Sequence, residues 1–101
     1  MQIRIDTEEQ IERERIIRRL LYSLNAGRED IDSVRLSLTT TSDALGVKRY
    51  RCRLHTKLRD GQFIEFDEMQ SNSELAITRA LERCARTARR RLYRPEQRRI
   101  E

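Results

Sequence analysis

The stretch KRYRCRLHTKLRDGQFIEFDE, residues 48–68, decides the fold, because its two alternating halves pair consistently in only one way. A two-residue loop would place Glu65 opposite Thr56, and a carboxylate would then lie in the core at a large cost. A three-residue loop ending at Gly61 instead pairs Thr56 with Ile64. It also gives Gly61 the left-handed position that such loops need. We therefore predict a β-hairpin with a three-residue loop.

This hairpin has an apolar face and a charged face. The apolar face holds Tyr50, Cys52, Leu54, Thr56, Leu58, Ile64 and Phe66. The charged face carries cations that we call the strand row: Arg49, Arg51, Arg53, His55 and Lys57. The predicted register sets Asp67 opposite Arg53 and Glu65 opposite His55, which leaves the other cations of the strand row unopposed. Such cross-strand pairs favour a solvated sheet face, with a nucleic-acid surface as the alternative.

Two further strands and a helix are predicted before the hairpin. Residues 1–6 alternate, and so do residues 32–41, with Val34, Leu36, Leu38 and Thr40 on the inner face. Residues 7–10, TEEQ, match a capping box that opens a helix. The apolar side of this helix holds Ile16, Ile17, Leu20, Leu21 and Leu24, and Gly27 is its expected C-cap.

A second helix is predicted after the hairpin. Residues 71–74, SNSE, match another capping box, and Pro95 ends the helix or nearly does. Several residues of the apolar side are small, so the helix axis can lie close to the sheet. The apolar side consists of Ile77, Ala80, Leu81, Cys84, Ala85, Ala88 and Leu92.

The element order is therefore β-α-β-β-β-α. Because every strand has one wet face, we expect an α+β two-layer sandwich, with a four-stranded sheet and two helices on one of its faces. The first two strands should be parallel if they are neighbours. Residues 1–94 form a single domain in this prediction, and residues 95–101 form a short tail.

Positive charge is concentrated in the second half of the chain. Its 101 residues carry a net charge of +5. Residues 1–47 hold seven Arg against nine acidic residues, whereas residues 48–101 hold thirteen Arg and two Lys against eight. Arginine has a planar fork of donors that suits phosphate. The charge balance therefore points to a polyanionic partner for the second half.

Most of this charge lies on the second helix. Steps of three or four residues align five of its arginines, which we call the Arg row: Arg79, Arg83, Arg86, Arg90 and Arg94. A row of guanidinium groups over about 20 Å can follow a phosphate backbone. Arg18 and Arg19 of the first helix would extend this surface if the helices lie side by side. A plain solvated helix face is the alternative.

Enzymatic chemistry finds little support in the sequence. His55, the single histidine, faces away from Cys52 in an alternating strand, so no Cys–His dyad forms there. Two cysteines and one histidine do not make a zinc site, and three glycines make no phosphate-binding loop. We expect no catalysis, cofactor, metal or small-molecule substrate, and free thiols at Cys52 and Cys84. No segment is apolar enough to span a membrane, so we expect a cytoplasmic protein.

The chain resembles the ribosome hibernation-promoting factor family, also called ribosome-associated inhibitors or ribosomal subunit interface proteins. The resemblance rests on the element order, on MQIRI at residues 1–5 and on NSELAITRALERCARTARRRL at residues 72–92, where Ala76-Ile77 has the matching place. The sequence also departs from the family. The glycine-containing start of the first helix is missing, and residues 6–15 are shorter and more acidic. Leu75 stands where an aromatic often opens the last helix.

This resemblance implies a short-form protein that binds the small ribosomal subunit in the channel for messenger and transfer RNA and inhibits translation under stress. It implies ribosomal RNA contacts by the Arg row and by Arg18 and Arg19. Two alternatives stay open. One is an interaction module whose Arg-rich helix binds an acidic protein, and the other is a general double-stranded RNA-binding protein.

Overall fold

The computed structural model describes residues 1–7, 13–24 and 29–92. Its elements follow the predicted order: β1 (Gln2–Thr7), α1 (Arg13–Ser23), β2 (Ile31–Ser42), β3 (Lys48–Leu58), β4 (Phe63–Gln70) and α2 (Ser73–Leu92). Three predicted features lie outside the described residues: most of the first capping box, the C-cap at Gly27 and the helix stop at Pro95.

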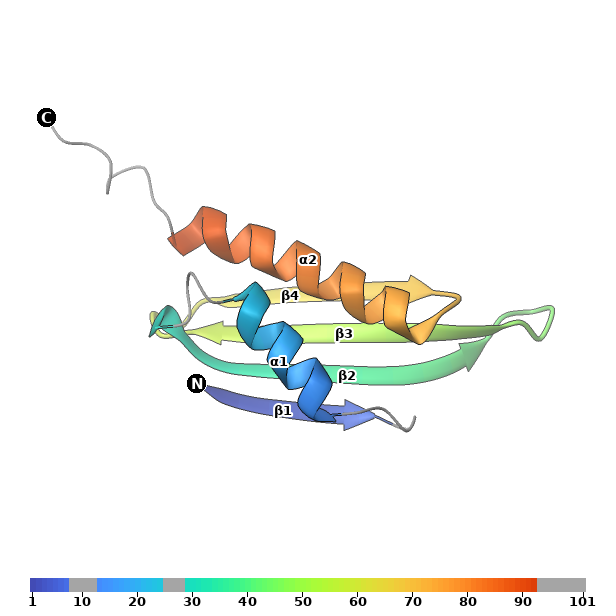
Figure 1. Cartoon of the computed structure of the whole chain (residues 1–101). Helices are drawn as coiled ribbons and strands as arrows, with labels where there is room; N and C mark the ends of the chain where they lie inside the picture. Colours follow the sequence, from blue (N-terminus) through green and yellow to red (C-terminus); the bar gives the residue numbers. More distant parts are fainter. Residues whose placement is uncertain (8–12, 25–28, 93–101) are drawn as a thin grey trace, which may run out of the picture.

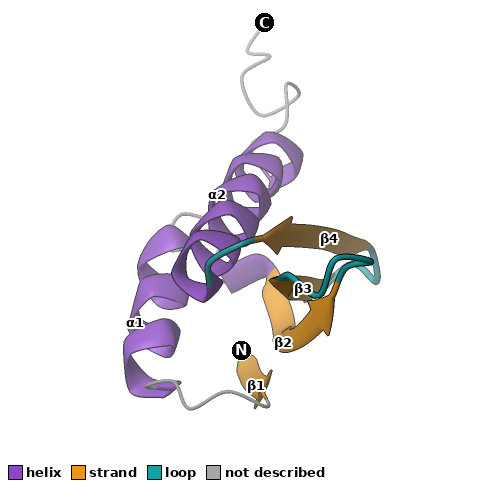
Figure 2. Cartoon of the chain, turned by 90° about the vertical axis from the view of Figure 1, so that its right-hand side faces the viewer, coloured by secondary structure: helices purple, strands orange, loops and turns teal. Residues whose placement is uncertain are grey.

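The four strands form one sheet in the order β1-β2-β3-β4 (Figure 1). β1 runs parallel to β2, as expected for neighbours joined by a helix, and the other neighbours are antiparallel. Both helices cover the same face of the sheet, and no helix of the described residues lies on the opposite face (Figure 2). The predicted two-layer α+β sandwich is confirmed.

The β3–β4 hairpin has the predicted register. Thr56 pairs with Ile64, and the Leu58 N–H donates to the Gln62 carbonyl oxygen at 2.8 Å across the loop. Gly61 has a φ of +91°, a conformation that a side chain would strain. The Glu65 carboxylate therefore lies on the open face, as the sequence predicted.

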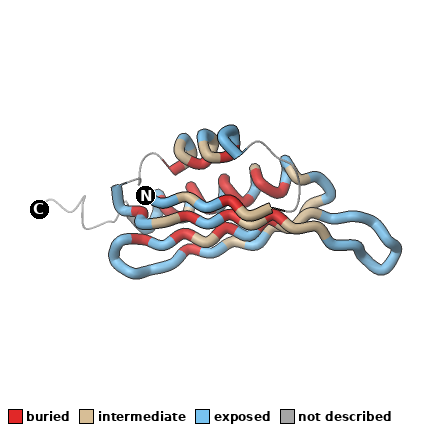
Figure 3. Tube along the Cα trace, turned by 90° about the horizontal axis from the view of Figure 1, so that it is seen from below, coloured by how far each residue is buried: buried red, intermediate tan, exposed pale blue. Residues whose placement is uncertain are grey.

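The core lies between the sheet and the two helices (Figure 3). The predicted apolar side of α2 is buried throughout its described side chains, and Ala80 and Ile77 are fully covered at 0% exposure. Cys84 packs so closely on the sheet that its sulfur lies 3.4 Å from the Thr56 hydroxyl oxygen. The small residues of α2 thus let its axis approach the strands, as expected.

The start of α2 differs from the prediction by one residue. The Asn72 side-chain oxygen, rather than that of Ser71, accepts the hydrogen bond that caps the helix, from the Leu75 N–H at 3.1 Å. Glu74 is consequently not the partner in a capping box. Its carboxylate instead accepts hydrogen bonds from Arg15 and Arg19 of α1. Thr7, the first residue of the other predicted capping box, is the last residue of β1.

Both cysteines are expected to react slowly with a thiol reagent in the native protein. Cys52 and Cys84 are 0% and 1% exposed, and burial raises the pKa of the Cys52 thiol to about 12. Burial also raises the pKa of the Cys84 thiol. Since the thiolate is the reactive form, labelling with a chromogenic disulfide at pH 8 should be slow until denaturant is added. Fast native labelling of either cysteine would show that its strand or helix face is wrongly placed.

Candidate nucleic-acid interface

The outer side of α2 carries exposed arginines opposite its buried side. Arg79, Arg86 and Arg90 are all exposed, and none forms an ion pair with another described residue. The three lie within about 40° of each other around the helix axis and span about 16 Å along it. Glu82 lies in the same span, yet within residues 29–92 it pairs with none of them. The guanidinium groups are therefore available to an external anion.

Arg83 is placed differently from the rest of the Arg row. Its Nη1 lies 3.2 Å from a carboxylate oxygen of Glu68, and its guanidinium covers the Phe66 ring at 4.8 Å from the ring centre. Arg91 makes a similar contact, donating to the Phe63 carbonyl oxygen at 3.1 Å. Both side chains join α2 to β4. Arg94, the last predicted member of the row, lies outside the described residues.

The two predicted arginines of the first helix differ in exposure. The two helices lie side by side, but Arg19 is partly buried between them, where it binds the Glu74 carboxylate at 3.3 Å and the Thr78 hydroxyl. Arg15 also binds Glu74, at 2.8 Å. Arg18 is exposed and lies about 100° around α1 from Arg19, opposite the buried side chains of Ile16 and Leu20. Of the two predicted residues, Arg18 alone is thus presented outward.

The structure adds one arginine that the sequence reasoning missed. Arg89 is exposed and has no ion pair with the described side chains. It lies about 100° around the helix from Arg90, so it falls outside the line formed by Arg79, Arg86 and Arg90. The shortage of acidic residues in this half of α2 was a signal that could have found it.

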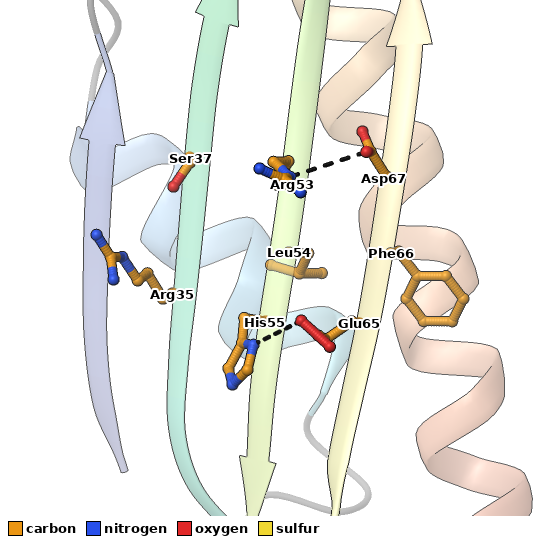
Figure 4. A pocket seen from close by; sticks show the side chains of 8 residues that line it. All are labelled: Arg35, Ser37, Arg53, Leu54, His55, Glu65, Phe66 and Asp67. Atoms are coloured by element: carbon orange, nitrogen blue, oxygen red, sulfur yellow. Dashed lines mark hydrogen bonds and ion pairs between the residues drawn. The ribbon is translucent and has the colours of Figure 1, made fainter.

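Arg53 and His55 of the strand row line a groove on the open face of the sheet (Figure 4). Its polar lining consists of Arg35, Ser37, Arg53, His55, Glu65 and Asp67, and it also borders Leu54 and Phe66, whose side chains belong to the core face. The predicted pair of His55 with Glu65 is present, with Nδ1 and Oε2 3.1 Å apart. Two carboxylates therefore face the same groove as the cations.

Asp67 has a second, closer partner besides the predicted Arg53. Asp67 is opposite Arg53 in register, but Arg53 Nε is 3.8 Å away, whereas Arg51 Nε donates to it at 2.9 Å. Arg51 is opposite the next residue of that face and reaches Asp67 along the diagonal. Its hydrogen bonds hold the pKa of the Asp67 carboxyl below the usual value. The prediction that Arg51 is unopposed is wrong. Arg49 also has an acid nearby, with its Nε 3.8 Å from Asp43.

The described residues contain neither a cluster of metal-ligand side chains nor a cysteine paired with the histidine. Across residues 1–7, 13–24 and 29–92, no three His, Cys, Asp or Glu side chains are grouped to hold a metal ion. The His55 ring lies on the open face, and the Cys52 thiol is buried on the other. No helix of the described chain has the length and apolar character needed to cross a membrane.

Comparisons with known proteins identify the fold. A scan of protein-family models and a search of curated proteins find no match to the sequence. Among solved structures, a ribosomal subunit interface protein from Coxiella burnetii matches with a TM-score of 0.71 and 11% identity, over 93% of this chain and 100% of that one. The Protein Y N-terminal domain of Thermus thermophilus matches with a TM-score of 0.67 and 17% identity, over 87% of this chain and 96% of that one. The chain thus has the fold of the ribosomal subunit interface proteins that its sequence resembles.

Proposed function

We propose that the protein is a ribosome-associated regulator of translation that binds small-subunit ribosomal RNA through the outer side of α2. The observation that carries this proposal is the line formed by Arg79, Arg86 and Arg90, which are exposed and unpaired within the described chain. The fold shared with a ribosomal subunit interface protein supports a ribosomal partner. The same proposal places the protein in the cytoplasm, inhibiting translation under stress, without enzymatic activity.

The arginines have different roles in this proposal. Arg79, Arg86 and Arg90 meet phosphates of the RNA backbone, and Arg94 continues their spacing. Arg18 provides a further contact from α1. Arg83 and Arg19 already hold carboxylates of the protein itself, so they contribute mainly by fixing α2 on β4 and on α1. Binding then releases counterions from the RNA and weakens as salt rises.

Sedimentation with purified ribosomal particles tests this function. The protein should pellet with 30S subunits at low salt and much less with 50S subunits. Equal binding to a plain RNA duplex would instead indicate a general double-stranded RNA-binding protein. Displacement by an acidic protein, but not by RNA, would favour the protein-partner alternative. Failure to pellet with 30S subunits at any salt would contradict the proposal.

The strand row should contribute little to this binding. Arg53→Ala is expected to change affinity for the 30S subunit by less than about threefold, because the carboxylates of Glu65 and Asp67 share the groove and weaken its field. Arg86→Ala, measured in the same assay, should show the larger loss. If Arg53→Ala costs as much as Arg86→Ala, the open sheet face is a binding surface.

A further inference from the structure

The β2–β3 hairpin extends beyond the rest of the sheet. The pairing of β1 with β2 stops at Leu38, and the pairing of β4 with β3 stops at Tyr50. Past these points, among the residues that the structure describes, β2 and β3 pair only with each other, as far as Ser42 and Lys48. The turn between them therefore projects from the body of the molecule, at the right-hand end of Figure 1.

Hydrogen bonds give this projecting turn a fixed shape. One Asp43 carboxylate oxygen accepts the N–H groups of Leu45 and Val47, each at 2.9 Å. The Gly46 N–H donates to the Asp43 carbonyl oxygen at 2.9 Å, and the Asp43 N–H donates to the Val47 carbonyl oxygen at 3.0 Å. Gly46 has a φ of +80°, which its missing side chain permits. The turn is thus held by four hydrogen bonds, two of which are accepted by the Asp43 carboxylate.

The fixed turn presents aliphatic side chains to solvent. Leu45 is 88% exposed and Val47 is 48% exposed, and neither belongs to the core. The two strand residues that follow, Lys48 and Arg49, are exposed cations, and the Arg49 Nε lies 3.8 Å from the Asp43 carboxylate. An aliphatic tip with cations behind it is complementary to an apolar pocket with an acidic rim.

We propose that this tip, residues 43–47, docks into an apolar pocket on a protein of the small ribosomal subunit. A protein fits the tip better than RNA does. Four of the five N–H groups of the tip, those of Asp43, Leu45, Gly46 and Val47, are already used within the turn, so they do not form a nest for a phosphate. The Asp43 carboxylate at their centre would repel one, and aliphatic side chains offer no ring for a base to stack on. The inference rests on the proposed function, because it takes the ribosome as the particle that carries the partner.

Photo-crosslinking to purified 30S subunits tests this partner. With p-benzoylphenylalanine in place of Leu45, a crosslink to a ribosomal protein, identified by mass spectrometry, is the expected result. Crosslinks only to RNA, or none while the protein still pellets with 30S subunits, would overturn the docking inference and leave the proposed function standing. A wild-type protein that does not pellet would overturn both.

Affinity measurements supply a second test. The double variant Leu45→Ser/Val47→Ser should bind 30S subunits about tenfold more weakly, the effect of losing one buried aliphatic side chain or more. Met69→Ser is the matched control, because Met69 is 47% exposed on the sheet and outside the tip. Asp43→Ala keeps the aliphatic side chains but removes the carboxylate that orders them, and should also weaken binding. Equal affinity of the double variant and the Met69 control would contradict the inference.

Discussion

The double substitution Arg86→Ala/Arg90→Ala is expected to weaken binding to the 30S subunit by at least about tenfold at low salt. Each charge-assisted hydrogen bond contributes about 1.5–3 kcal/mol, and about 1.4 kcal/mol corresponds to a factor of ten. Both side chains are exposed and opposite the buried side of α2, so the fold should be retained. Circular dichroism checks this, and equilibrium sedimentation or filter binding measures the affinity.

A matched control separates the effect of an arginine's position on affinity from the effect of the protein's net charge. Lys57→Ala/Arg59→Ala removes two positive charges from exposed positions on the β3–β4 hairpin and should change affinity by less than about threefold. Arg86→Lys/Arg90→Lys keeps the charge without the planar fork, so its loss should fall between wild type and the Ala pair. Equal losses from both Ala pairs would mean that net charge, rather than the outer side of α2, determines binding.

Leu54→Ala is expected to lower the free energy of unfolding by about 2–5 kcal/mol, the usual range for a fully buried leucine. Leu54 is 1% exposed in β3, where Leu36 and Phe66 pair with it from both sides. A single domain has only about 5–15 kcal/mol of stability, so this loss is a large fraction of the total. Urea unfolding followed by circular dichroism measures it.

The same substitution at the exposed tip is its control. Leu45→Ala removes the same atoms from a side chain that is 88% exposed, and it should change stability by less than about 0.5 kcal/mol. A Leu54→Ala variant as stable as the Leu45→Ala variant would contradict the position of β3 in the centre of the core.

The strands and the faces of the helices were predictable because each depends on a strict period. Glu65 and Gly61 together excluded one hairpin register, and the alternating residues of β3 then had only one inward set. Helical spacing placed Ile77 and Cys84 on the buried side of α2 in the same way. If the pattern were assigned one residue out of step, charged side chains would be buried, so the sequence allowed few other assignments of the inward faces.

The details that the sequence did not reveal depend on choices between neighbouring groups. Asn72 and Ser71 can both cap a helix, and the hydrogen bond to Leu75 decides between them. Arg51 binds Asp67 along a diagonal, and the strand register alone does not predict this contact. Arg19 forms an ion pair with Glu74, a residue of the other helix. Such pairings follow from tertiary packing, so a single-sequence pattern does not contain them.

The salt dependence of 30S binding tests the central claim most directly. If Arg79, Arg86 and Arg90 each meet one phosphate, they should together contribute about −2 to −3 to the wild-type slope of log K against log salt, and the further contact of Arg18 should make the slope steeper. The Arg86→Ala/Arg90→Ala variant should then have a slope flatter by about 1.5. Equal slopes for the two proteins, with the variant still folded, would contradict the account and remove α2 from RNA binding.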